Sequence, residues 1–210
     1  MRYRRCTTSL SLVVAMLWLS ACTVLPKPEP IVVERYTLDP QPTVQLSEDV
    51  SDDRVGPVLL VPRPLVRAEL DTPRMAYREQ DYVLRYFARS RWADVPSQLL
   101  LPDLISAFEA SGRYTAVVRT GSAAVPRLRL DTDLIEFSQD FRVEPSVFRV
   151  RLRVQLLDLE TREVVLSHVF AAEQPASEDS PGGGAQAANA AWQRLLTDAV
   201  AYVNGRLPSD

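Results

Sequence analysis

The sequence predicts a single α+β domain, in which two main helices pack on one face of a mostly antiparallel β-sheet. Apolar residues alternate almost strictly with charged ones over residues 148–156, which is typical of an antiparallel strand with one face in water. Residues 97–111 and 186–204 place leucines or alanines at helical spacing, as amphipathic helices do. The sequence shows neither an internal repeat nor a second domain.

The first half of the chain is expected to form four short strands and one helix. The strands cover residues 36–38, 58–61, 74–79 and 82–87, which are short apolar or aromatic runs. Residues 79–81 are predicted as the hairpin turn between the last two strands. The helix over residues 97–111 ends at Gly112. Pro102 predicts a kink or a fresh helix start there, because proline is tolerated in a first turn but not in a helix interior.

The second half is expected to form four more strands and the last helix. The strands cover residues 114–119, 127–134, 148–156 and 164–172, and residues 160–162 turn between the last two. Residues 175–184 are rich in Ser, Pro, Gly and acid, and they predict a flexible loop. The final helix follows, and Asn204 and Gly205 cap its end. Strands and helices in this order are typical of an α+β domain.

The N-terminus has the composition of a secretory signal peptide. Arg2, Arg4 and Arg5 precede the uncharged apolar stretch 10–19, and small residues follow before Cys22. The apolar stretch is about half of the ~20 residues that a membrane-spanning helix needs, so a transmembrane span is the weaker interpretation.

The spacing at the end of this stretch predicts lipid attachment. The sequence Leu-Ser-Ala-Cys at residues 19–22 resembles the bacterial lipobox, in which the cysteine is acylated and becomes the mature N-terminus. An ordinary signal peptide with an incidental cysteine is the alternative. We therefore divide the chain into a signal peptide (1–21), the lipidated Cys22 with a proline-rich tether (22–35), the domain (36–204) and a tail (205–210). Thr23, in place of Asp, favours the outer membrane over the inner membrane.

Composition excludes several classes of function. Without residues 1–21 the chain has 21 basic and 27 acidic residues, which argues against binding nucleic acid. Cys6 is removed with the signal peptide and Cys22 is acylated. No thiol is then left for a disulfide, a thiolate metal site or a nucleophile.

Motifs for catalysis are weak, so we expect neither an enzyme nor a cofactor or metal site. The sole histidine, His168, lies in a predicted strand without a local nucleophile and acid. Residues 182–184 are three glycines, but they lack the Lys-Ser/Thr of a phosphate-binding loop. Asp131 and Asp133 fit charges on a sheet surface better than a pair of catalytic carboxylates.

Residues 74–92 combine arginine with aromatic residues at a density typical of binding surfaces. The candidate partner-binding residues are Arg74, Tyr77, Arg78, Tyr86, Arg91 and Trp92. Half-buried rings that are covered by arginine stems are the alternative interpretation.

Several features together resemble the ABC-type transport auxiliary lipoproteins, the group that includes the paraquat-inducible protein C type. They are the lipobox, Tyr-Thr-Leu at 36–38, Tyr-Phe-Ala at 86–88 leading to Arg-Trp-Ala at 91–93, the leucine-rich helix ending at Ser111 and Gly112, and an alanine-rich last helix with Trp192. The resemblance covers roughly residues 36–203. Phe87 stands where the family usually has a second tyrosine.

The resemblance implies a non-catalytic role in a transport system. Such lipoproteins accompany an ABC permease, its ATPase and an MCE (mammalian cell entry) domain protein, and these systems are thought to move phospholipids or other hydrophobic molecules between the two membranes of a Gram-negative bacterium. It implies a lipid-anchored outer-membrane protein that faces the periplasm, with a homo-oligomer possible. A stand-alone periplasmic lipid carrier and a structural envelope lipoprotein are the alternatives.

Overall fold

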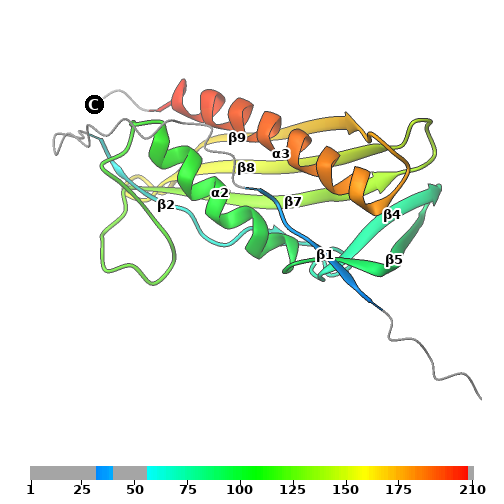
Figure 1. The fold of residues 1–210 in the computed structure, drawn as a ribbon. Coiled ribbons are helices and arrows are strands. Elements are labelled where there is room, and N and C mark those ends of the chain that lie inside the picture. Colours follow the sequence, from blue (N-terminus) through cyan, green and yellow to red (C-terminus); the bar gives the residue numbers. More distant parts are fainter. Residues whose placement is uncertain (1–31, 40–55, 208–210) are drawn as a thin grey trace, which may run out of the picture. The chain divides into compact units, whose positions relative to one another are not determined.

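The computed structural model describes residues 32–39 and 56–207. The predicted signal peptide, Cys22, most of the tether and the acidic segment around residue 50 lie outside the described residues. Within the described part, a sheet of nine strands is covered by two helices (Figure 1). This confirms the single α+β domain that the sequence predicts.

The sheet is mixed, and its antiparallel pairs are the long ones. In chain order the strands are β1 (Glu34–Tyr36), β2 (Val58–Leu60), β3 (Leu65–Val66), β4 (Arg74–Gln80), β5 (Val83–Trp92), β6 (Ala116–Val118), β7 (Leu128–Asp140), β8 (Val147–Asp158) and β9 (Glu163–Pro175). The pairs β4–β5, β7–β8 and β8–β9 are antiparallel. The pairs of β7 with β2, β3 and β4, of β2 with β6 and of β1 with β5 are parallel and short.

The β7–β8–β9 meander follows the sequence pattern most closely. In β8, the alternation places Phe148, Val150 and Leu152 in the core. The intervening Arg151 and the following Arg153 are exposed. The strands are longer than predicted, because β7 continues to Asp140 and β9 to Pro175 through polar residues. Those extensions pair in register with β8, so hydrogen bonding between strands maintains them where hydrophobic alternation fades.

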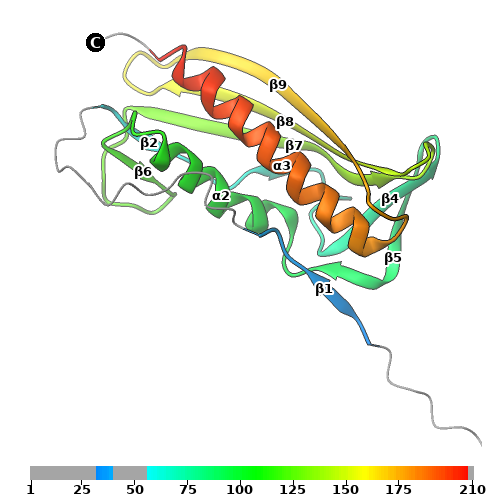
Figure 2. The same cartoon turned by 45° about the horizontal axis from the view of Figure 1, so that its top comes forward.

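Both helices lie on the same face of the sheet, α3 (Pro181–Asn204) over β8 and β9 and α2 (Pro96–Ala110) beside it (Figure 2). Helix α2 does not restart at Pro102, as the sequence analysis allowed, but begins at Pro96 and continues through Pro102. Burial of Leu100, Leu104 and Phe108, none of which has any exposed surface, offsets the one backbone hydrogen bond that the inner proline removes.

Helix α3 begins earlier than predicted, so residues 181–184 are not part of a flexible loop. Ser180 caps the helix by accepting a hydrogen bond from the amide of Gly183 at 3.0 Å, and Pro181 occupies the first turn. Glycine at residues 183 and 184 permits close approaches: a Cβ would collide with the carbonyl oxygen of Glu178 at the first position and with the buried side-chain amide of Gln139 on β7 at the second. The glycines that suggested a loop therefore let the helix pack closely on the sheet.

Large side chains fill the space between sheet and helices. Trp192 of α3 is fully buried and donates a hydrogen bond from Nε1 to Asp103 of α2 at 2.8 Å. Burial raises the pKa of Asp103, while the indole donor favours its charged form. This bond joins the two helices inside the core.

Two local features were not predicted. The two-residue strand β3 is too short to give a sequence pattern, and it exists through its pairing with β7. The turn of the β4–β5 hairpin falls at Asp81 and Tyr82 and not at the predicted residues 79–81, because Gln80 pairs with Val83. Tyr82 has a φ of 63° and is fully exposed at the tip.

Candidate functional site

The β4–β5 hairpin carries the six residues that the sequence analysis proposed as a partner surface, and the structure gives several of them contacts within the domain. The guanidinium of exposed Arg74 lies 3.9 Å from the ring centroid of Tyr86. The Tyr86 hydroxyl donates to the carbonyl oxygen of Glu69 at 2.7 Å. Arg74 and Tyr86 therefore form a cation–π pair that is fixed to the loop before β4.

Tyr77 is part of a half-buried aromatic cluster. Its ring centroid lies 4.5 Å from that of Phe87 and 5.8 Å from that of Phe141, which follows β7. The amide of Phe141 donates to the carbonyl oxygen of Arg78 at 2.8 Å. Tyr77 and Arg78 thus join the hairpin to the end of β7. Phe141 was missed because no sequence periodicity connects it to residues 74–92.

Trp92 lies in the core, with 2 % of its surface exposed. Its ring centroid is 5.1 Å from that of Phe137 and 6.0 Å from that of Phe148. This position corresponds to the packing alternative, so we do not include Trp92 in a contact surface below.

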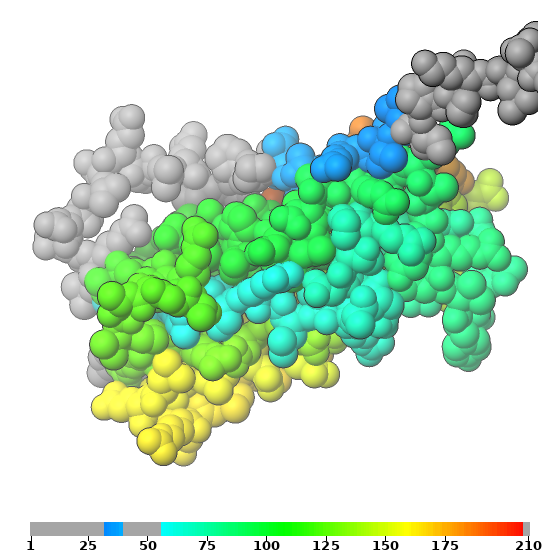
Figure 3. Space-filling model, turned by 90° about the horizontal axis from the view of Figure 1, so that it is seen from below, coloured from blue at the N-terminus to red at the C-terminus, as the bar shows by residue number. Residues whose placement is uncertain are grey.

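Arg91 lies in a row of three arginines. It stands opposite Arg74 of β4 and opposite Arg35 of β1 in the strand register. Figure 3 shows β1, in blue, beside the blue-green surface of the hairpin. Sequence reasoning missed Arg35, because residues 22–35 resemble a tether and nothing local indicates a parallel pairing with β5.

A cluster of charged residues lies where the hairpin tip meets the β7–β8 turn. It contains Asp81, Asp140, Arg142, Arg149 and Glu173, and we call it the Asp140 cluster. Asp140 is 1 % exposed, and its carboxylate accepts hydrogen bonds from Arg142 at 2.7 and 2.8 Å and from Arg149 at 2.9 Å. Hydrogen bonds from Arg142 lower the pKa of Asp140 to about 2.

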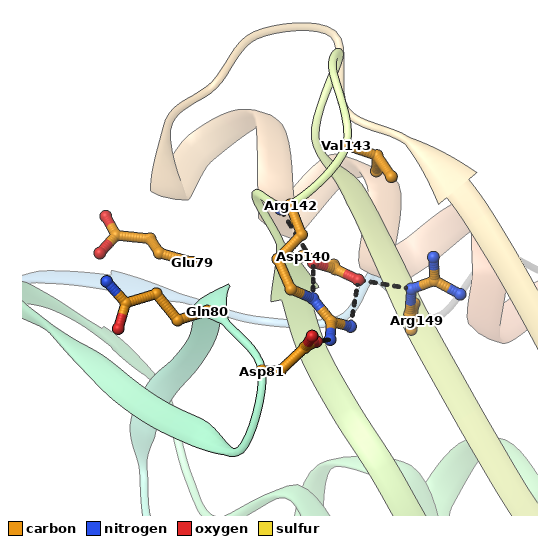
Figure 4. Close-up of a pocket in the computed structure, with 7 residues that line it drawn as sticks. All are labelled: Glu79, Gln80, Asp81, Asp140, Arg142, Val143 and Arg149. Carbon is orange, nitrogen blue, oxygen red and sulfur yellow. Dashed lines mark hydrogen bonds and ion pairs between the residues drawn. The ribbon is translucent and has the colours of Figure 1, made fainter.

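The Asp140 cluster borders an open depression of about 510 Å³, which Figure 4 shows together with Glu79, Gln80 and Val143. Arg142 also pairs with Asp81 at the hairpin tip, and Arg149 pairs with Glu173 of β9. Each of these arginines is thus held by two carboxylates. Asp140 is ionised at neutral pH and fully hydrogen-bonded, which suits a clamp between hairpin and sheet better than proton transfer.

The other residues considered as candidates for catalysis contact neighbouring side chains of the fold. His168 is exposed on β9 and stacks on Tyr202 of α3, with ring centroids 4.5 Å apart. Asp131 pairs with Arg129 at 2.7 Å. Within residues 32–39 and 56–207, no group of three or more His, Cys, Asp or Glu side chains could hold a metal ion. In the same part of the chain, no helix is long and apolar enough to cross a membrane.

The described residues form an α+β domain that presents an arginine-rich hairpin, and they contain no evident reaction centre. Comparison with known proteins identifies the family. The sequence model of the ABC-type transport auxiliary lipoprotein component matches residues 36–200, and the chain belongs to this family. The resemblance seen in the sequence is thereby confirmed. A search of curated proteins finds no match.

Solved structures share the fold. Protein XCC0632 from Xanthomonas campestris is similar to this chain with a TM-score of 0.70 and 24 % identity, over 82 % of this chain and 97 % of that one. The hypothetical protein CT253 from Chlamydia trachomatis has a TM-score of 0.53 and 12 % identity, over 74 % of this chain and all of that one. At these identities the likeness is one of fold.

Proposed function

We propose that this chain is a lipid-anchored periplasmic protein of the outer membrane that serves as the non-catalytic docking component of an ABC/MCE-type transport system. The system would move phospholipid or other hydrophobic molecules between the inner and outer membranes. The proposal combines the family, which is that of ABC-transport auxiliary lipoproteins, with the Leu-Ser-Ala-Cys sequence that ends at Cys22. Its partners would be the MCE-domain protein and, through it, the permease and the ATPase.

The observation that favours docking over carriage is the set of large aromatic side chains buried between sheet and helices. A lipid carrier needs an apolar cavity, whereas the residues between sheet and helices here include Trp92, Trp192, Phe108 and Phe137 with at most 2 % of their surface exposed. The depression beside the Asp140 cluster is lined mainly by charged and polar side chains, which do not suit an acyl chain.

The hairpin is the surface that we propose for the protein partner. It projects from the sheet as a ten-residue strand and a seven-residue strand that meet at the exposed tip. The Asp140 cluster holds that tip against the β7–β8 turn, so the hairpin is fixed before a partner binds. A fixed surface loses less conformational entropy on binding than a mobile one.

Co-purification tests the proposal. The full chain with a C-terminal tag is isolated from membranes in mild detergent, and bound proteins are identified by mass spectrometry. As a control, residues 1–35 are fused to an unrelated soluble domain, which retains the anchor and lacks this domain. We expect an MCE-domain protein with the full chain and not with the control. Equal recovery in both samples, or none with the full chain, contradicts docking.

Native mass spectrometry distinguishes the carrier alternative. The mature chain carrying Cys22→Ser has no anchor lipid, so any lipid found with it occupies the domain. Docking predicts no stoichiometric lipid, whereas a carrier should retain about one molecule per chain.

A further inference from the structure

Three arginines from strands far apart in the sequence lie side by side across the hairpin. Arg35 of β1, Arg91 of β5 and Arg74 of β4 are directly opposite one another in the register, at about 4.8 Å from strand to strand. Residues beside them in the sequence, Trp92 and Met75, face the core with 2 % exposure each. Arg91 lies between buried Ser90 and Trp92, so alternation places its side chain on the opposite face, and its register partners Arg35 and Arg74 share that face. Arg35 and Arg74 are exposed and Arg91 is half-buried.

The charges of this row are not neutralised within the described part of the chain. None of the ion pairs of residues 32–39 and 56–207 includes Arg35, Arg74 or Arg91. Other exposed arginines, such as Arg113, Arg119 and Arg151, are also outside these ion pairs, but they do not stand opposite further arginines in a strand register. Like charges directly opposite each other destabilise a sheet. A row of this kind is stabilised when an anion lies over it.

The position of Arg35 in the sequence indicates which anion lies near the arginine row. Arg35 follows the proposed anchor at Cys22 by 13 residues, a segment that spans at most about 45 Å when fully extended. The row therefore stays within reach of the membrane surface that holds the acyl chains, at a high effective concentration of phospholipid headgroups.

We propose that Arg35, Arg91 and Arg74 form a binding site for anionic phospholipid headgroups, which holds the outer face of the hairpin base against the anchoring membrane. The inference rests on the proposed lipid anchor. Under this proposal, Arg74 and Arg91 contact the membrane and the hairpin tip contacts the protein partner. Arginine suits this task because its planar guanidinium donates two parallel hydrogen bonds to a phosphate.

Vesicle binding by the mature chain with Cys22→Ser tests the proposal, because no acyl chain then masks a weaker contact. Binding is measured by sedimentation with vesicles of phosphatidylglycerol and phosphatidylethanolamine, and with vesicles of phosphatidylcholine alone. We expect preference for the anionic vesicles and weakening by salt. A juxtamembrane arginine contributes about fivefold in affinity, so the triple change of Arg35, Arg74 and Arg91 to Gln should weaken binding by about a hundredfold.

The matched control changes three other exposed arginines, Arg113, Arg119 and Arg151, to Gln, and so removes the same charge elsewhere. Its affinity for the anionic vesicles should fall by less than about fivefold. Urea unfolding checks that both variants are folded. In the row variant, relief of repulsion opposes the loss of the Arg74–Tyr86 contact, so it should unfold at nearly the same urea concentration as its parent. Lack of preference for anionic vesicles in the parent, or equal losses in both variants, overturns the proposal.

The test also separates this inference from the proposed function. If the row variant of the Cys22→Ser chain binds anionic vesicles as tightly as its parent, while the lipidated row variant no longer recovers the MCE-domain protein, the row is a protein contact. The membrane site is then wrong while docking stands. If the parent recovers no MCE-domain protein and the row variant still loses vesicle binding, docking fails and the membrane site stands.

Discussion

Replacement of Trp92 by alanine separates a packing role for the hairpin base from a recognition role. The indole is 2 % exposed and lies 5.1 Å and 6.0 Å, between ring centroids, from Phe137 and Phe148. A buried aromatic side chain removes about 150–250 Å² from water, or roughly 4–6 kcal/mol at ~25 cal/mol/Å². Truncations of this kind usually cost about 3–5 kcal/mol, because the site relaxes in part. We expect Trp92→Ala to lower the free energy of unfolding by about 4 kcal/mol.

Urea unfolding of the mature chain measures this cost. With a denaturant dependence of about 2 kcal/mol/M, the midpoint should fall by about 2 M. Arg91→Gln is the matched control, since residue 91 precedes Trp92 and faces the other side of the sheet. Its free energy of unfolding should change by less than about 0.5 kcal/mol. A Trp92→Ala chain of unchanged midpoint that loses its protein partner would refute the reasoning, since the indole would then be a contact residue.

Three further predictions concern the Asp140 cluster, the start of α3 and the anchor. The pKa of Asp140 is lowered from 3.8 to about 2. Its ion pairs should therefore add about 2 kcal/mol to the free energy of unfolding, a contribution that is complete above pH ~4 and lost as the pH falls through ~2. Asp140→Asn should remove this part of the acid sensitivity, as measured by urea unfolding at different pH values. Gly184→Ala should lower the free energy of unfolding by about 1–2 kcal/mol in the same assay, because the added Cβ meets the buried side chain of Gln139. Gly182→Ala is the control and should leave this free energy unchanged, because no atom lies closer than 3.6 Å to its Cβ. Cys22→Ser should release the chain from membranes into the periplasmic fraction, and mass spectrometry of the unchanged mature chain should show acyl groups at Cys22.

Sequence predicts best those elements whose pattern is local. The alternation of Phe148, Val150 and Leu152 fixes both the strand and its buried face, because a one-residue shift would place arginines in the core. The stripe of Leu100, Leu104 and Phe108 fixes the buried face of α2 in the same way. For the six residues named, period and burial agree.

Elements that depend on distant partners were not predictable in the same way. The parallel pairing of β1 with β5 has no local signal, so Arg35 was assigned to the tether and the arginine row was missed. Phe141 lies in a turn, and only the folded chain places it beside Tyr77. At residue 184 the side chain that a Cβ would meet is Gln139, which is 45 residues earlier in the chain.

In the candidate site, too, the sequence indicated the region but not the burial of each residue. Composition alone singled out residues 74–92, but it could not tell a buried indole at Trp92 from an exposed guanidinium at Arg74. Arginine and aromatic residues are used both in interfaces and at the edge of a core. Burial separates the two uses, and burial is a property of the tertiary structure.

Photo-crosslinking in intact cells tests the central claim, docking of the hairpin on an MCE-domain protein, most directly. A photoreactive residue is placed at Tyr82, which is fully exposed at the hairpin tip, and as a control at Val125, which is 88 % exposed and lies outside the hairpin. The account predicts a crosslink from residue 82 to an MCE-domain protein and none from residue 125. Equal crosslinking from both positions, or no such crosslink from residue 82 in a chain that is correctly anchored, would contradict it.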